Sequence, residues 1–116
     1  MKARDARELG ERLATLVSAG EIEPALDLLL PLLTQRTSFA VLRRIAAPVG
    51  AVALQPANQL LARIAQGHTQ GGWVVIATVL DGQLDLDLAG ALSRCHDYIV
   101  LANVWYATDT LGEGVV

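Results

Sequence analysis

Aromatic residues, cysteine and long apolar runs are all scarce in this chain of 116 residues. Aromatic side chains make up only 4% of a composition that is 53% hydrophobic, so leucine, alanine and valine must fill the core. Leucine and alanine in this proportion suit helices that pack closely together. The single cysteine, Cys95, cannot form a disulfide within the chain, which favours a reducing, cytoplasmic location.

We expect neither a membrane-spanning segment nor a secretory signal in this sequence. Its longest uncharged apolar run, around residues 73–80, is far shorter than the ~18–20 residues that a helix needs to cross a bilayer. Residues 1–5 are followed by further charged residues, where a signal peptide would have an apolar segment. We therefore expect no contact with a membrane.

Glycine, proline and capping residues divide the chain, residues 1–116, into seven expected short helices within a single domain. No alternation of apolar and polar residues runs long enough to predict a sheet. The β-branched segment 73–80 follows two glycines in a helical context, so we predict a helix there too. The glycine-rich tract 67–72 is the clearest linker. The other boundaries are Gly20 as the end of the first helix, Pro24 and Pro56 near the starts of the second and fourth, Ser38 and Asp85 as caps of the third and sixth, and residues 48–55 as a loop.

Seven antiparallel helices, with pairs opening about every 30–35 residues, predict an all-α solenoid of HEAT-like or ARM-like helical pairs. Apolar residues at helical spacing predict the core face of each helix. In the fifth helix this face consists of Trp73, Ile76, Ala77 and Leu80, and in the sixth of Leu88, Leu92, Cys95, Ile99 and Ala102.

Acidic residues are missing from the middle of the chain. Between residues 28 and 80 the only charged side chains are Arg36, Arg43, Arg44 and Arg63, whereas both ends are acidic and the net charge is −3. Such a basic band predicts contact with the phosphates of double-stranded DNA, which proteins bind mainly through arginine and lysine. The alternative is that the four arginines lie on solvated helix faces and keep a leucine-rich chain soluble.

Residues 105–109 combine aromatic and polar side chains where the core does not require them. Asn103 can cap a seventh helix that begins at Val104. Trp105 and Asp109 then lie about 5–6 Å apart at Cβ, off the core face, because they are four residues apart. A large aromatic surface beside an ionised carboxylate is typical of a site for a flat, cationic ligand. The alternative is that Trp105 is a packing residue.

The stretch 71–116, with its Trp105-x-x-x-Asp109 segment, resembles the middle of the DNA alkylation repair proteins of the AlkD type. These are right-handed stacks of HEAT-like helical pairs, in which a Trp-x-x-x-Asp segment opens a helix after a long preceding helix. The family excises positively charged N3- and N7-alkylated purines from DNA. The Trp contacts the deoxyribose of the damaged nucleotide, and the Asp is thought to stabilise the positive charge that develops on that sugar.

The resemblance implies that Trp105 and Asp109 are catalytic in a DNA glycosylase, and that Trp105 and Tyr106 contact DNA together with the arginine band. Two features depart from the family. The residues between Trp105 and Asp109 differ from the usual second Trp or extra Asp. The chain also ends at Val116, inside the motif helix, so we expect a truncated solenoid without the downstream repeats, which argues against full activity.

The alternative function is a non-catalytic HEAT-like binding or scaffold module that self-associates. The acidic net charge and the apolar face exposed by a truncated solenoid favour it, and they predict a homo-oligomer. We expect no metal, because Cys95, His96 and Asp97 are adjacent and point about 100° apart on a helix. We expect no nucleotide cofactor either, because the tract 67–72 lacks the lysine and the preceding strand of a phosphate-binding loop.

Overall fold

The computed structural model describes the backbone of residues 2–35 and 37–115, and the side chains within these ranges up to Val104. The described chain consists of helices joined by short turns and contains no strand, which confirms the expected all-α class. Within these ranges the structure has six α-helices, where seven were predicted. They are α1 (Ala3–Ser18), α2 (Ile22–Thr34), α3 (Phe39–Ala46), α4 (Leu54–Gln66), α5 (Gln70–Gln83) and α6 (Leu88–Val115), with a 3-10 helix, η1 (Ala47–Ala51), after α3.

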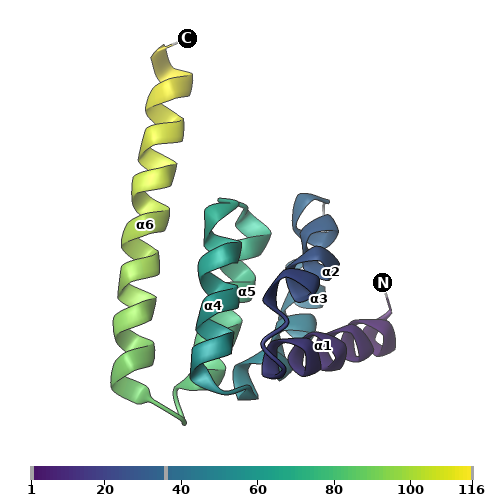
Figure 1. Cartoon of the computed structure of the whole chain (residues 1–116). Coiled ribbons are helices and arrows are strands. Elements are labelled where there is room, and N and C mark those ends of the chain that lie inside the picture. Colours follow the sequence, from purple (N-terminus) through teal and green to yellow (C-terminus); the bar gives the residue numbers. More distant parts are fainter. Residues whose placement is uncertain (1, 36, 116) are drawn as a thin grey trace.

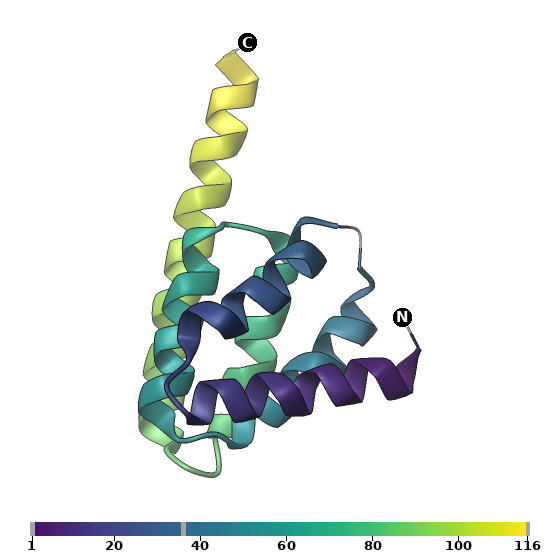
Figure 2. The same cartoon turned by 45° about the vertical axis from the view of Figure 1, so that its right-hand side comes forward.

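Helix α5 lies at the centre of the molecule. It contacts α3 and η1, and it also packs against α4, α2 and α6. Helix α2 lies against α4 as α3 lies against α5, so successive helices stack side by side in two layers, and α1 crosses one end (Figures 1 and 2). This two-layer stacking is the helical-repeat arrangement expected from the sequence.

Local capping explains why several helix boundaries fall where the sequence predicts them. The Ser38 Oγ accepts a hydrogen bond from the Val41 backbone N–H (3.2 Å) and caps α3. Gly20 has φ 79°, a left-handed conformation that ends α1 without the steric cost that a Cβ would bring. These signals need only a few neighbouring residues, so the sequence is sufficient to find them.

Three local predictions differ from the structure. Residues 48–55 are not a plain loop, because they include most of η1 and the first residues of α4. The linker is shorter than the tract 67–72, because the Thr69 Oγ1 caps α5 by accepting from the Gly72 N–H (2.9 Å) and the helix begins at Gln70. Asp87, not Asp85, caps α6, since its Oδ1 accepts from the Gly90 N–H (3.1 Å).

The largest difference is at Asn103, which lies inside α6 and does not cap a seventh helix. Asparagine costs a helix interior only a few tenths of a kcal/mol relative to better helix formers, so it does not stop a helix by itself. The 28 residues of α6 therefore form one helix about 42 Å long, twice the length of the 14-residue α5. Helix α6 runs antiparallel to α5 and extends well beyond the helices beside it (Figure 1).

Helices α5 and η1 approach each other through two glycines. A Cβ added to Gly82 would lie 2.8 Å from the Gly50 Cα, a distance that requires one backbone to move. This contact brings η1 close enough for the buried Val49 and Val79 to share one core. The other large side chains of that core include Leu13, Leu29, Leu42, Ile45, Leu60, Leu61 and Ile64.

Replacement Gly82→Ala is expected to lower the free energy of unfolding by about 1–2 kcal/mol. Overpacking costs about 1–3 kcal/mol, and the better helix propensity of alanine returns up to about 1 kcal/mol. Urea denaturation followed by circular dichroism measures the change. Gly67→Ala is the control, because its Cβ would meet nothing closer than the Ile64 carbonyl oxygen at 3.4 Å. Equal stabilities for the two variants would contradict the close approach.

Candidate functional site

The residues that the sequence motif singles out fall largely outside the described side chains. Trp105, Tyr106 and Asp109 follow Val104 in the last part of α6, and Arg36 is the single internal residue outside the described ranges. Positions 105 and 109 belong to one helix, as the i,i+4 interpretation requires. That helix does not open at the motif, however, because it has already run through residues 88–104.

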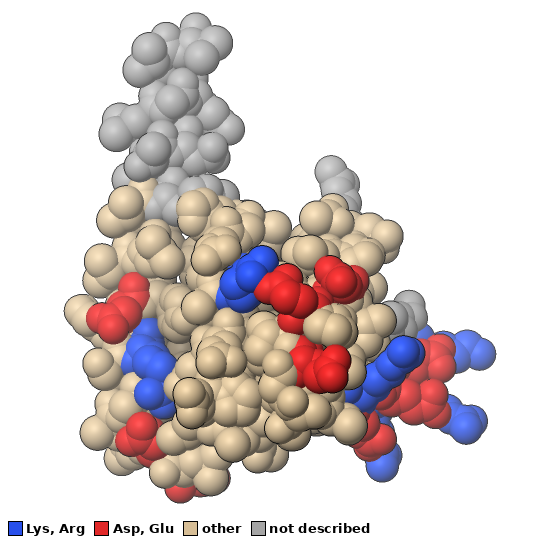
Figure 3. Space-filling view, viewed as in Figure 1, with Lys and Arg blue, Asp and Glu red and all other residues tan. Residues whose placement is uncertain are grey.

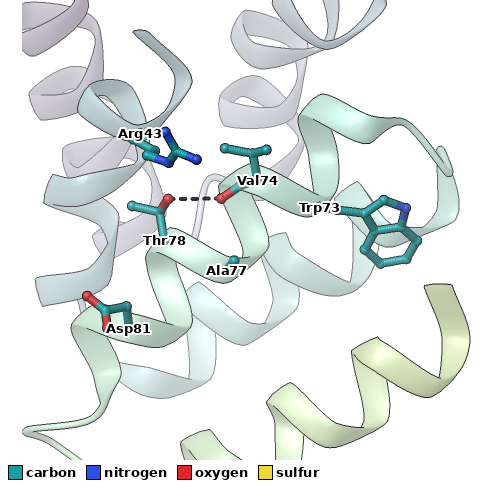
Figure 4. Close-up of a pocket in the computed structure, with 6 residues that line it drawn as sticks. All are labelled: Arg43, Trp73, Val74, Ala77, Thr78 and Asp81. Atoms are coloured by element: carbon teal, nitrogen blue, oxygen red, sulfur yellow. Dashed lines mark hydrogen bonds between the residues drawn. The ribbon is translucent and has the colours of Figure 1, made fainter. Parts of the chain in front are cut away.

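The three described arginines of the basic band lie in both layers. Arg63 of α4 forms an ion pair with Glu23 of α2, within the α2–α4 layer. Arg43 of α3 lines a cavity with residues of α5, within the other layer (Figure 4). Arg44 is exposed and points about 100° away from its neighbour Arg43. On the face shown in Figure 3, basic and acidic side chains lie beside one another.

An apolar groove runs between α5 and α6. One section has a volume of about 230 Å³ and the next about 170 Å³. Both sections are lined by Ala77, Leu80 and Cys95, so they form one continuous surface, which we call the α5–α6 groove. The rest of its lining is Trp73, Ile76, Asp81, Leu84, Ala91, Leu92, Tyr98, Ile99 and Ala102.

Trp73 and Ala77 also belong to a third cavity, of about 490 Å³, on the adjoining side of α5. Figure 4 shows that its residues come from α5, except for Arg43 of α3, and that Trp73 points away from Arg43. The His68 ring stacks against the Trp73 indole, with the ring centroids 6.5 Å apart. Ala77 thus occupies the middle of an exposed apolar strip, which has charged side chains, Arg43 and Asp81, along one edge.

The predicted core faces of α5 and α6 are only partly buried. Ala77 is exposed, and Leu88, Leu92 and Ile99 are 60%, 56% and 55% exposed. Helix α6 instead turns Ala91, which is 1% exposed, and the half-buried Tyr98 toward the body. The apolar side of α6 is therefore wider than the side that α5 covers, and the uncovered part forms one wall of the groove.

A polar cluster around the buried Gln83, which sequence reasoning missed, holds α6 in this orientation. The Gln83 side chain has no exposed surface, and its Nε2 donates a hydrogen bond to the Asn58 Oδ1 of α4 (3.0 Å). The Arg94 Nη2 of α6 donates to the Gln83 Oε1 (3.1 Å) and lies 3.6 Å from the Asp87 Oδ2. The cluster links three helices, although its members are far apart in the sequence.

The α5–α6 groove suits the side chains of another helix better than a small molecule. Small-molecule sites usually enclose about 300–1,000 Å³ and converge several polar groups on the ligand. The joined sections reach only the lower part of that volume range, and they are lined mainly by aliphatic and aromatic side chains, so few polar groups converge on the groove. An amphipathic helix binds such grooves by placing apolar residues at helical spacing along them.

Comparison with known proteins finds no matching family model, no matching curated protein and no matching solved structure. Within the described residues, no helix is both long enough and apolar enough to cross a membrane. The α5–α6 groove and the placement of the arginines therefore carry the functional argument.

Tyr98, which lines the groove, makes the stability of the folded protein depend on pH. Burial raises the pKa of its phenol above the ordinary value of about 10, while Arg94 lowers it and Asp97 raises it by smaller amounts. The folded protein holds this proton more tightly than the unfolded chain, so the free energy of unfolding should fall as the pH rises from about 10 through the folded-state pKa. Tyr98→Phe should remove this part of the fall. Urea denaturation of both proteins between pH 8 and about pH 11 measures the difference. If the free energy of unfolding falls equally with pH in both proteins, the phenol is not buried.

Proposed function

We propose that this protein is a non-catalytic helical-repeat binding module, which binds an amphipathic helix in the α5–α6 groove and uses it to self-associate. The observation that carries the proposal is where the exposed apolar side chains gather. Among the described residues, nine large hydrophobic side chains are exposed, and three of them, Leu88, Leu92 and Ile99, share one face of α6, where Leu92 and Ile99 line the groove. Isolated apolar residues on a surface need no explanation, but a contiguous patch is typical of an interaction site.

The free energy available from this surface favours an apolar helix as the ligand. Complete burial of a leucine, isoleucine or valine side chain is worth about 1.5–3 kcal/mol. Covering the exposed halves of Leu88, Leu92 and Ile99 therefore contributes about 2–5 kcal/mol. Association itself costs about 4–15 kcal/mol. A ligand that buries a similar apolar face of its own raises the gain into that range, whereas a polar ligand does not.

A charge placed in the middle of the groove should abolish helix binding. Ala77 is exposed and lines both sections of the groove and the adjoining cavity beside Arg43, so Ala77→Glu leaves the core intact but sets a carboxylate under the bound helix. Affinity for a designed amphipathic peptide, with leucines at alternating spacings of three and four residues, should fall at least about tenfold. Isothermal titration calorimetry measures the affinity, and apolar burial predicts a negative heat-capacity change.

The matched control for this experiment is Ala62→Glu, which makes the same substitution at an exposed position of α4. It should bind the peptide with unchanged affinity, because α4 does not line the groove. If Ala77→Glu binds as tightly as the unaltered protein, the groove is not the binding site. If both variants lose binding, the effect comes from net charge and not from the groove.

A second candidate function is the DNA glycosylase activity that the Trp105-x-x-x-Asp109 motif implies. The spacing within one helix favours it, since both residues could then meet one deoxyribose. Asp109 would stabilise the oxocarbenium-like charge that develops on the sugar during cleavage. The positive charge of an alkylated purine makes the base a good leaving group, so little acid catalysis is needed. The division of Arg43 and Arg63 between two layers is unfavourable to a single DNA-binding surface.

Release of N7-methylguanine from a duplex that carries this lesion tests the glycosylase candidate directly. The candidate predicts release by the unaltered protein and its loss in Asp109→Asn. It also predicts that replacing Arg43 and Arg44 with glutamine weakens duplex binding about equally for all sequences and lowers the salt slope by roughly one unit per lost phosphate contact. No release from the unaltered protein, with DNA binding indifferent to the two arginines, would eliminate this candidate.

A further inference from the structure

We infer that the helix that binds in the α5–α6 groove is α6 of a second copy of this chain, antiparallel to the first. The inference rests on the proposed function and names the partner for it. Its first support is the spacing of Leu88, Leu92, Cys95, Ile99 and Ala102, which alternates between four and three residues over two heptads. This spacing is typical of the seam between two helices that pack along their length.

The seam is complementary to itself. If a two-fold axis passes between Cys95 and His96, antiparallel pairing sets Leu92 of each copy opposite Ile99 of the other. Both side chains are more than half exposed in the single chain, and both line the groove. A two-fold interface uses the same patch on both copies, so one association covers both grooves and both exposed stripes. An unrelated helix would cover only one groove and one exposed stripe.

The charges on α6 do not oppose this pairing. Among its described residues, the ionised side chains are Arg94 and Asp97, and neither belongs to the seam. Arg94 is turned toward the body, where it bonds to Gln83. The positions that flank the seam are occupied by Ala89, His96 and Asn103 on one side and by Ala91 and Tyr98 on the other. Two copies can therefore pair along the seam without bringing charged side chains of α6 together.

The position and direction of the groove also fit a second α6. A helix antiparallel to α6 is parallel to α5, and in the groove it contacts both helices. Helix α6 continues past Asn103 without a turn, so the described chain supplies no further helix to lie along it. Residues 88–104 alone span about 25 Å of helix, which matches the length of α5, about 21 Å.

The experiment compares two substitutions on the seam with one on the opposite side of α6. Sedimentation equilibrium of the full chain should show a dimer at micromolar concentration. Leu92→Glu and Ile99→Glu should each weaken the dimer at least about 30-fold, because each copy would bury a carboxylate in the seam. Leu101→Glu is the matched control, since Leu101 is also exposed (40%) but lies about 180–200° around the helix from those two residues. It should leave the dimer unchanged.

The direction of pairing is measured independently with a nitroxide at Ala89→Cys in a Cys95→Ala background. Antiparallel pairing about the stated axis separates the two labelled positions by about 20 Å along the helices, whereas parallel pairing holds them about 10 Å apart. This measurement uses a protein with an unaltered Leu92 and Ile99, so it decides the question even if the glutamate variants do not fold.

A monomer at all concentrations overturns the inference, as does a dimer that survives both seam substitutions or one that Leu101→Glu dissociates equally. A distance between the nitroxides of about 10 Å, as in parallel pairing, also overturns it. A monomer that still binds the designed peptide, with that binding lost in Ala77→Glu, refutes the second copy as partner but preserves the groove as a helix-binding site. If the unaltered protein neither dimerises nor binds the designed peptide, the proposed function is refuted as well.

Discussion

The hydrogen bond from Arg94 to Gln83 determines how the rest of α6 is presented. Gln83 is completely buried, and it already donates to Asn58 of α4, so its carbonyl is satisfied only when α6 lies in this orientation. Asp87 supports the arrangement from the start of α6, where it both caps the helix and lies near Arg94. A buried carbonyl that loses its donor costs about 1–3 kcal/mol, which is a large part of a small domain's stability. The polar cluster therefore constrains the rotation of α6 more strictly than apolar contacts alone.

The α5–α6 groove is a consequence of that rotation. With Arg94 bonded to Gln83, Ala91 faces the body, and Leu92 and Ile99 remain at its edge. The small side chain of Ala77 on α5 leaves space opposite them. A rotation that buried Leu92 and Ile99 would break the bond to Gln83. The molecule thus satisfies the buried amide of Gln83 and leaves apolar surface for a partner, because an unpaired buried polar group costs more than a half-exposed leucine.

Local signals in the sequence were sufficient for the fold class and for most helix boundaries. Ser38 and Gly20 act on residues within one turn, so their effects do not depend on the rest of the chain. The candidate groove could be predicted only in part, because the stripe of Leu92 and Ile99 is visible in the sequence but its exposure is not. Exposure depends on Gln83 and Asn58, which are 25 residues apart and become partners only in the folded chain. Asn103 shows the opposite case, since its capping ability has no effect where the chain does not turn.

The two candidate functions use different parts of one helix, and this relation follows from the uninterrupted course of α6. In the proposed pairing, residues 88–103 of the two copies lie side by side, because an axis between Cys95 and His96 sets position 88 opposite position 103. Positions 105 and 109 lie beyond the start of the other copy's α6 and take no part in that seam. Self-association therefore neither requires nor precludes a role for Trp105 and Asp109 at a deoxyribose. It would instead fix the two motif segments at opposite ends of a rigid helical pair, each held by the polar cluster that sets the orientation of its own helix.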